Sequence, residues 1–335
     1  GRWAPAQGKP DTMAIADGFV GNRPSLSDVL FDASARDFRS FATVPSNVEA
    51  TEAAVHFSRK LVPFVALIGP SGWGKTHLLE SALSGFPTRE RLRVSACDWL
   101  RDAGRESPHA LALDDVQEVL AKTRSRVHLR LALERRLRAG KPTILALSPD
   151  QTGRSLRTFL PSLSEWILAR IEVPDAEERE MVLRHLAAQD GMNLSPVLPR
   201  VLARRVVGNG RSLSGALKRL RLYGKDWETS DAALKACGLL QPFFGDDDVC
   251  SLQDQILLEA QRTSQRRHSA GEIAAYLMQR VAGLSEADAS RFLEIRPSDA
   301  YTAAARVSAG AAADAELAED LRLAVERVLD RLAES

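Results

Sequence analysis

The stretch FVALIGPSGWGKTHLLESAL, residues 64–83, decides the fold of this chain. It opens with the apolar run FVALI, which predicts a buried strand, and it ends with HLLESAL, which predicts a helix. The segment between them, residues 69–76, is a glycine loop that ends in Lys-Thr, and we call it the cradle. A strand, such a loop and a helix form a phosphate-binding unit. The open question is whether the nucleotide drives turnover or is held so that its presence is sensed.

The cradle matches the pattern G-x-x-x-x-G-K-[ST] at Gly69, Gly74, Lys75 and Thr76. Its glycines allow backbone N–H groups to form a nest around the β-phosphate. Lys75 is expected to reach the β- and γ-phosphates, and the Thr76 hydroxyl to bind Mg²⁺. The helix predicted from His77 offers its positive end to the anion. The residues expected to bind ATP or ADP are Gly69, Pro70, Ser71, Gly72, Trp73, Gly74, Lys75, Thr76 and His77.

Two further apolar runs predict strands that end beside the cradle. HALALDDVQ, residues 109–117, ends in an acid pair. Asp114 is expected to bind Mg²⁺, and Asp115 to orient or deprotonate the attacking water. Asp is one methylene shorter than the Glu common at the second position, which favours slow hydrolysis. PTILALSPD, residues 142–150, carries Ser148 at its polar end, placed to contact the γ-phosphate or the water.

NGRSLSGALKRL, residues 209–220, predicts an amphipathic helix with Arg211 at its start and Leu213, Leu217 and Leu220 as its apolar stripe. An Arg here, in a helical lid, is expected to contact the γ-phosphate and to distinguish ATP from ADP. The alternative is a surface Arg in a basic helix. Alternating strands and helices followed by helices alone predict a parallel α/β domain with a helical lid. Ligands of such sheets bind at the carboxyl ends of the strands, where the motifs fall.

Composition sets outer limits on the function. The chain has 335 residues, enough for two or three domains, of which 44% are hydrophobic. We expect no membrane span and no signal peptide, because no apolar run approaches the roughly 20 residues of a membrane helix. Residues 248–335 hold 10 Lys and Arg against 15 Asp and Glu. Basic clusters at 122–141 and 200–225 are expected to be solvated helix faces, and the first of them is alternatively a contact for DNA or a neighbouring subunit.

Together, these motifs resemble the DnaA-like branch of the AAA+ ATPases. GPSGWGKTHLL, LDDVQ and NGRSLSGAL are similar to its cradle, acid pair and lid Arg motif, and FATVPSNVEATEAA resembles the segment on the adenine side. More weakly, CSLQDQILLEAQ, RRHSAGEIAAYLMQRVAGLS and RFLEIRPSDAYTAAARV resemble the helical DNA-binding domain of DnaA. The chain is then expected to hold a flexible lead at 1–29, an AAA+ core at 30–175, a helical lid at 176–247 and a helical C-terminal domain at 248–335.

Two departures from the family concern assembly. Ser162 falls where the family has an Arg that touches the neighbouring subunit's ATP, and Arg154 and Arg157 lie upstream as alternatives. Asp114 follows Thr76 by only 38 positions, which is short for the extra helical hairpin that initiators carry there. The sequence therefore leaves the oligomeric state open, including a homo-oligomer.

A third departure concerns DNA. RPSDAYTAA, residues 296–304, lacks the family's base-reading residues, although Pro297 suits a helix start. Ser269 and Gly271 stand where the family has basic phosphate contacts. The tail, residues 313–335, predicts an amphipathic helix that packs within its domain or docks on a partner.

Three functional hypotheses follow. The first is a DnaA-like ATP-binding switch in bacterial DNA replication initiation or its control, with DNA as partner. The alternative is a protein–protein regulator, similar to DnaA inactivators or helicase loaders, which docks on a replication initiator or replicative helicase and binds DNA little. A plain ATPase motor is disfavoured by Asp115 and by the missing Arg. All place the chain in the bacterial cytoplasm, at the nucleoid for a DNA-bound switch.

Overall fold

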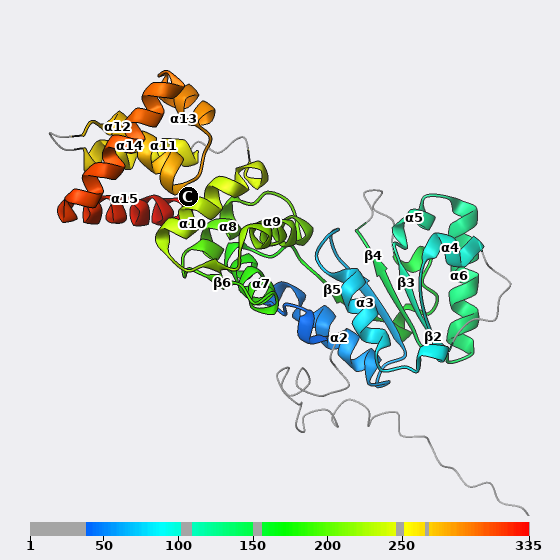
Figure 1. Cartoon of the computed structure of the whole chain (residues 1–335). Helices are drawn as coiled ribbons and strands as arrows, with labels where there is room; N and C mark the ends of the chain where they lie inside the picture. The colour runs from blue at the N-terminus through cyan, green and yellow to red at the C-terminus, as the bar shows by residue number, and fades with distance from the viewer. Residues whose placement is uncertain (1–37, 102–108, 150–155, 246–250, 265–267, 335) are drawn as a thin grey trace, which may run out of the picture.

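The computed structural model describes residues 38–101, 109–149, 156–245, 251–264 and 268–334. Figure 1 shows a sheet with its helices at one end of the molecule and an all-helical part at the other. Within these ranges, every helix is too short or too polar to cross a membrane. The order of elements is the predicted one, α/β first and helices afterwards.

A five-stranded parallel sheet in the order β2-β3-β4-β1-β5 forms the centre of the α/β part. The strands are β1 (Phe64–Ile68), β2 (Arg91–Ser95), β3 (Ala110–Asp114), β4 (Thr143–Leu147) and β5 (Ile167–Arg170). The strands predicted within FVALI, 109–117 and 142–150 are confirmed. Ile68 pairs with Leu147, so β1 and β4 end together. The cradle and Ser148 follow these ends, at the edge where ligands of parallel sheets bind.

Helices cover both faces of the sheet. One face carries α2 (Val48–Ser58) and α3 (Lys75–Leu83), and the other carries α4 (Ala96–Arg101), α5 (Gln117–Leu120) and α6 (Thr123–Arg138). Val65 and Leu67 of β1 join the first core, and Phe64 and Ala66 join the second, because successive side chains of a strand point to opposite faces. Both faces of the sheet are therefore buried, which explains why the strand sequences are continuous apolar runs. Short 3₁₀ helices lie at Pro45–Asn47, Thr88–Glu90, Leu156–Thr158 and Leu163–Glu165.

The lid follows β5. It consists of α7 (Ala176–Gln189), α8 (Leu198–Arg205), α9 (Gly210–Tyr223) and α10 (Ser230–Leu240), with the two-stranded ribbon β6 (Asn193–Leu194) and β7 (Asp226–Trp227) and a 3₁₀ turn at Gln241–Phe243. α7 begins at a capping box, in which the Asp175 carboxylate accepts a hydrogen bond from the Glu178 N–H. The predicted stripe of α9, Leu213, Leu217 and Leu220, is buried in the lid core.

The C-terminal helices share the core of the lid. They are α11 (Leu252–Thr263), α12 (Ala270–Tyr276), a π-helical turn (Leu277–Val281), α13 (Glu286–Leu293), α14 (Pro297–Ala313) and α15 (Ala315–Glu334). α15 packs on α8 and α10 as well as on α11. It is the amphipathic helix predicted for the tail, and its apolar stripe is buried: Leu317, Leu321, Val325, Val328 and Leu332. One core therefore runs from the lid into the C-terminal helices, and the domain boundary expected at residue 248 stays a prediction.

Candidate nucleotide-binding site

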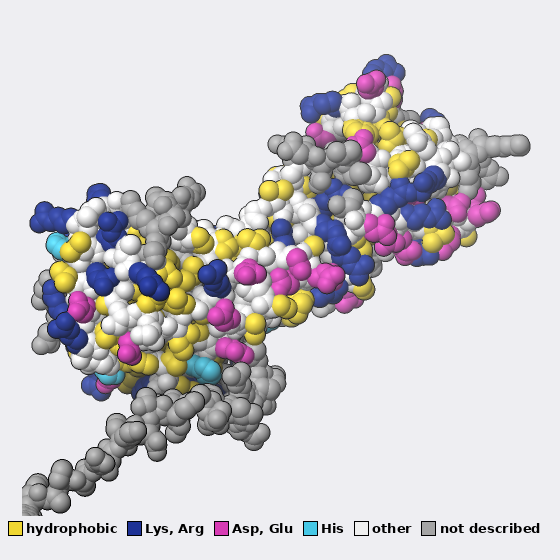
Figure 2. Space-filling view, turned by 180° about the vertical axis from the view of Figure 1, so that it is seen from behind, with side chains coloured by type: hydrophobic (Ala, Val, Ile, Leu, Met, Phe, Trp, Pro, Cys, Tyr) yellow, Lys and Arg dark blue, Asp and Glu magenta, His cyan; other side chains and the backbone are white. Residues whose placement is uncertain are grey.

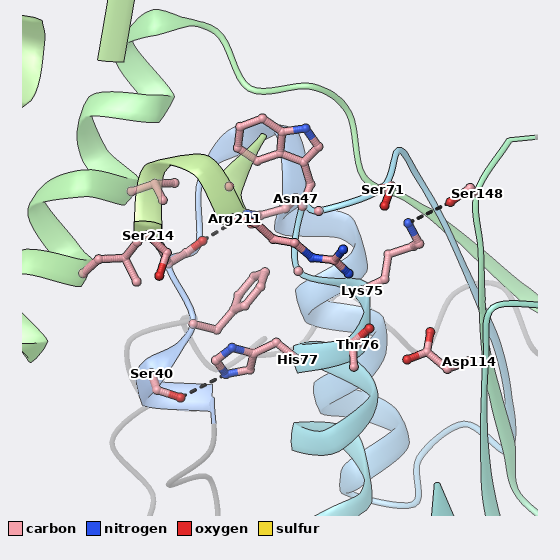
Figure 3. A pocket seen from close by; sticks show the side chains of 18 of the residues that line it. Ser40, Asn47, Ser71, Lys75, Thr76, His77, Asp114, Ser148, Arg211 and Ser214 are labelled. Atoms are coloured by element: carbon pink, nitrogen blue, oxygen red, sulfur yellow. Dashed lines mark hydrogen bonds between the residues drawn. The ribbon is translucent and has the colours of Figure 1, made fainter. Parts of the chain in front are cut away.

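A cavity of about 410 Å³ lies where the sheet edge meets the lid. Its lining comes from segments that are distant in sequence: residues 40–47, the cradle, the ends of β3 and β4, α7, and the first turns of α9. Figure 3 shows the labelled side chains converging from the sheet side and from the lid. The structure thus brings together the motifs that the sequence analysis selected one at a time.

The cradle has the backbone of a phosphate nest. Gly72 and Gly74 have φ angles of +84° and +90°, a region that L side chains avoid. Gly74 is the N-cap of α3, which begins at Lys75, two residues before the predicted start at His77. Ser71 to His77 line the cavity, whereas Gly69 and Pro70 are not among its lining residues and supply carbonyl groups that accept hydrogen bonds from Lys75. An anion in this loop would face the N-terminus of α3, where backbone N–H groups are unpaired.

Lys75 is buried at the centre of the cradle. Its ammonium donates hydrogen bonds to the carbonyls of Gly69 (2.7 Å) and Pro70 (2.8 Å) and to the Ser148 hydroxyl (3.3 Å). Burial lowers the pKa of Lys75, and the charges of Asp114 and Asp115 oppose that shift. The lysine therefore spans from the cradle to the end of β4, as Figure 3 shows.

The Thr76 hydroxyl and the Asp114 carboxylate lie on the same side of the cavity in Figure 3. Asp114 ends β3 and is 7% exposed, and one of its oxygens accepts a hydrogen bond from the Asp115 N–H. Two hard oxygen donors beside a phosphate nest fit Mg²⁺, which takes few protein ligands and completes its shell with phosphate and water. In the described part of the chain, no group of three or more His, Cys, Asp and Glu residues could form an all-protein metal cage. Arg93, which the sequence analysis did not select, lies 3.7 Å from the second Asp114 oxygen.

Asp115 is exposed and has a φ angle of +51°, which is rare for a residue other than glycine. Its carboxylate accepts a hydrogen bond of 2.9 Å from the Gln117 amide. The side-chain oxygen of Gln117 in turn accepts a hydrogen bond from the Ser148 backbone N–H at 3.0 Å. Gln117 thereby connects the second acid to the end of β4. Gln117 is the last residue of the stretch HALALDDVQ, but the spacing of the motif gave no reason to assign it a role.

Arg211 lies in the first turn of α9 and lines the cavity. Its backbone N–H donates to the side chain of Asn209, the N-cap, at 3.0 Å. In Figure 3 its guanidinium reaches from the lid toward Lys75. Ser214 and Lys218 of the same helix also line the cavity, and the sequence analysis selected neither.

The far end of the cavity is less charged. Phe41, Ala42 and Asn47 contribute from the segment FATVPSNVEATEAA, and Val182 and Leu186 from α7. His77 accepts or donates a hydrogen bond with the Ser40 hydroxyl at 2.9 Å, and its ring packs edge-on against Phe41. An apolar end opposite a phosphate nest suits a nucleotide base.

Ser162, Arg157 and Ser269, at which the sequence departs from the family, are not among the residues that line this cavity. Ser162 has a φ angle of +45° and stands at the N-cap position of a 3₁₀ turn, where its side chain forms no capping hydrogen bond. The Arg157 carbonyl accepts a hydrogen bond from Arg130, and Arg154 lies outside the described residues. Ser269 caps α12 in a capping box with Glu272. Of these residues, Ser269 has a clear local structural role, as the N-cap of α12.

The helix start expected at Pro297 is confirmed, with Pro297 as the first residue of α14. Arg296 and Asp299 at this start form two hydrogen bonds, of 2.8 and 3.0 Å, with each other. On the face shown in Figure 2, the helical part carries basic and acidic side chains side by side. Arg266 and Arg267, the basic residues next to Ser269, lie outside the described residues.

The chain is similar to bacterial replication initiators. It is 27% identical over 212 residues to the chromosomal replication initiator protein DnaA 2 of Chlamydia trachomatis serovar D, a match that covers 56% of this chain and 46% of the relative. It is 31% identical over 206 residues to the DnaA of Thermus thermophilus, with 54% and 47% covered. The chain thus spans about half the length of the curated relatives it matches. No protein-family model matches it.

Solved structures give the same fold. Domain III of the Thermotoga maritima replication initiation protein DnaA matches with a TM-score of 0.51 at 23% identity, covering 62% of this chain and 96% of that one. The AMPPCP-bound DnaA of Aquifex aeolicus matches with a TM-score of 0.50 at 19% identity, covering 87% and 96%. A DnaA bound to AMPPCP and single-stranded DNA matches with a TM-score of 0.50 at 18% identity, covering 88% and 97%. The AAA+ fold and the resemblance to the DnaA-like branch are confirmed.

Proposed function

From this likeness to the DnaA-like branch of the AAA+ ATPases, we propose that the chain is an ATP-binding switch in bacterial DNA replication initiation or its control. The observation that carries the proposal is that Arg211 of the lid and Lys75 of the cradle line one cavity. A lid cation beside the cradle gives the γ-phosphate of ATP a contact that ADP lacks. The two nucleotides then stabilise different lid positions, which is what a switch requires. The chain would act in the bacterial cytoplasm, at the nucleoid.

Each proposed role follows from the position of a side chain. The cradle N–H groups and Lys75 bind the phosphates. Thr76 and Asp114 hold Mg²⁺, whose charge offsets that of the phosphates. Asp115 orients the attacking water, and Ser148, joined to Lys75 by a hydrogen bond, contacts the γ-phosphate or that water. The solved relative bound to AMPPCP and single-stranded DNA supports a nucleotide and DNA as the ligand classes.

We propose that hydrolysis is slow. One oxygen of the Asp115 carboxylate accepts the hydrogen bond from Gln117, so the second oxygen is the one left to meet the water. The short Asp side chain also reaches less far than Glu. Slow turnover suits sensing, because the ATP-bound state then persists long enough to control an assembly.

Two substitutions test the site. Lys75→Ala is expected to weaken ATP and ADP binding by about 100-fold or more, which corresponds to roughly 2.7 kcal/mol. Arg211→Ala is expected to weaken ATP binding by about tenfold and to leave ADP binding within about twofold. Arg221→Ala is the matched control, because Arg221 lies on the same helix but pairs with Asp190 outside the cavity.

Titration with fluorescent ATP and ADP analogues measures all four proteins. Unchanged affinity in Lys75→Ala would show that the cradle is not the nucleotide site. An equal loss of ATP and ADP binding in Arg211→Ala would make Arg211 a structural residue and end its sensor role.

A second candidate function is a protein–protein regulator that docks on a replication initiator or a replicative helicase. Two observations favour it. Arg296 and Asp299, at the start of the helix that resembles the base-reading helix, are paired with each other. Acidic side chains alternate with basic ones over the helical part in Figure 2, which opposes contact with a polyanion.

Binding of labelled duplex and single-stranded DNA across a salt series, with ATP and with ADP, separates the two functions. An affinity that falls steeply with salt and depends on the nucleotide supports the switch, because released counterions drive such binding. Weak binding at low salt, together with retention of a purified initiator or helicase in a pull-down, supports the regulator.

A further inference from the structure

Trp73 connects the two halves of the molecule. Among the described residues, it is the partly buried hydrophobic side chain that packs both against the core under α2 and α3 and against the core of the lid. It stands in the cradle between Gly72 and Gly74, the two positions with positive φ. A large aromatic side chain between two such glycines is not needed for a phosphate nest, which is formed by backbone N–H groups.

The lid residue that meets Trp73 is Gly210, the first residue of α9. A methyl group built on Gly210 would lie 3.3 Å and 3.5 Å from two carbons of the Trp73 ring and 2.8 Å from the Gly72 carbonyl oxygen. The helix end is therefore pressed directly onto the cradle, and only a residue without a side chain fits between them.

Asn209 ties the same two segments by a hydrogen bond. Its amide nitrogen donates to the Ser71 carbonyl at 3.3 Å, while its amide oxygen accepts from the Arg211 N–H at 3.0 Å. A methyl group on Gly72 would lie 2.2 Å from the Asn209 side chain, so these groups are also packed closely. One side chain thus connects the cradle backbone to the backbone of Arg211.

We infer that Trp73, Asn209 and Gly210 form a latch that holds the start of α9 on the cradle and so sets the position of Arg211. The inference rests on the proposed function in one respect, that the cavity binds a nucleotide. Trp73 and Asn209 are then positioning residues, which act on the phosphates through Arg211. Because the latch contacts residues 71–73 of the cradle, a rearrangement of the cradle around a phosphate would also move the lid.

This mechanism differs from simple packing in what it predicts for specificity. If Trp73 only filled space, its loss would lower stability and weaken ATP and ADP equally. If it positions Arg211, disturbing the latch lowers the preference for ATP, because only ATP carries the phosphate that Arg211 reaches.

A pair of glycine substitutions on α9 separates these outcomes. Gly210→Ala places a methyl group against the Gly72 carbonyl and must widen the latch. Gly215→Ala, on the same helix, meets only the Phe243 ring at 3.4 Å and 3.9 Å, an ordinary contact. Gly215→Ala lies in the helix interior, where alanine favours the helix at least as much as at the first position, so a loss seen only in Gly210→Ala points to the latch. Asn209→Ser keeps a good N-cap but is too short to reach Ser71, and it tests the latch without adding volume.

The readouts are the ratio of ATP to ADP affinity and the tryptophan emission of the full chain. We expect Gly210→Ala and Asn209→Ser to lower the affinity ratio about fivefold or more, and Gly215→Ala to leave it within about twofold. Emission of Gly210→Ala should shift to longer wavelength as the Trp73 ring meets water. That shift should vanish when Trp73→Phe is added, because Trp73 is the tryptophan that lies against Gly210.

Each result decides the inference. An unchanged ratio and an unchanged spectrum in both Gly210→Ala and Asn209→Ser would overturn the latch while leaving the proposed function intact. If the wild-type chain bound neither nucleotide, the proposed function would fail, and the spectra alone would decide whether the contact exists. Should Gly210→Ala fail to fold, as judged by circular dichroism, the affinity ratio of Asn209→Ser decides whether the latch positions Arg211.

Discussion

Glu259 of α11 provides a test of how the C-terminal helices are held. It is fully buried, and its carboxylate faces three arginines. Arg331 and Arg262 lie 2.7 Å and 3.1 Å from one oxygen, and Arg327 lies 3.9 Å from the other. Arg327 and Arg331 belong to α15, so the carboxylate joins α11 to the helix that also packs on the lid. We predict that Glu259→Ala destabilises the whole helical part.

The magnitude follows from the exposures of the partners. Removing one member of a buried ion pair costs about 3–5 kcal/mol when the other stays buried and unpaired. Here Arg331 is 25% exposed, and Arg327 and Arg262 are 54% and 55% exposed, so they regain water once the carboxylate is gone. We therefore expect a lower loss of about 2–4 kcal/mol. Glu259→Gln, which keeps the volume and one acceptor, should cost about half as much.

Urea denaturation of the full chain, followed by circular dichroism, measures this loss. With a slope of about 3 kcal/mol per molar urea, Glu259→Ala should move the midpoint by about 1 M. Glu319→Gln on α15 is the control, because Glu319 pairs with Arg322 at the surface and should leave the midpoint unchanged. If the urea midpoint of Glu259→Ala equalled that of wild type or of Glu319→Gln, the Glu259 carboxylate would not contribute to the stability of the helical part.

Two further predictions concern titratable groups. Burial raises the pKa of the Cys237 thiol to about 12. Iodoacetamide at pH 8 should therefore label the half-buried Cys97 in the folded chain and Cys237 only after unfolding. Peptide masses measure the labelling of each cysteine, and equal labelling of the two in the folded chain would contradict the prediction. Hydrogen bonding to the Ser269 backbone, aided by Arg306, lowers the pKa of Glu272 in the folded chain. The stabilisation by the Glu272 carboxylate is present above the unfolded pKa of about 4.3 and is lost as the pH falls through the folded pKa. The loss of unfolding free energy in Glu272→Gln, measured with urea, should therefore shrink below about pH 4. If wild type and Glu272→Gln differed in unfolding free energy by the same amount at all pH values, the linkage would be refuted.

Much of the sheet and the cradle could be predicted from sequence, for physical reasons. A parallel strand covered on both faces has to be apolar throughout, so FVALI and its two companions stand out without any structural information. The cradle is recognisable because its shape depends on the backbone freedom of glycine at fixed spacing, as the φ angles of Gly72 and Gly74 show. The amphipathic character of α9 and α15 could also be predicted from sequence, because the buried residues of such helices recur with the helical period.

Contacts between segments could not be predicted in this way. Arg93 reaches Asp114 because β2 and β3 are neighbours in the sheet, an order that no local pattern reveals. Gln117 acquires its connection to Ser148 only when β3 and β4 lie side by side. The shared core of the lid and the C-terminal helices is a third case: the tail stripe predicted a buried face, but not that α8 and α10 would cover part of it.

That shared core determines what a lid movement would do. Leu213 of α9, Ile256 of α11 and Val328 of α15 belong to one buried cluster. Closely packed interiors transmit displacement with little deformation, so we expect these helices to move as a unit. Outside the latch, hydrogen bonds from the Ser46 N–H to Glu178 and from Gln189 to the Arg39 carbonyl join this unit to the α/β part. Under the proposed function, a change at the cradle that shifts α9 would therefore reorient α14 as well, and the C-terminal helices would respond to the nucleotide without touching it.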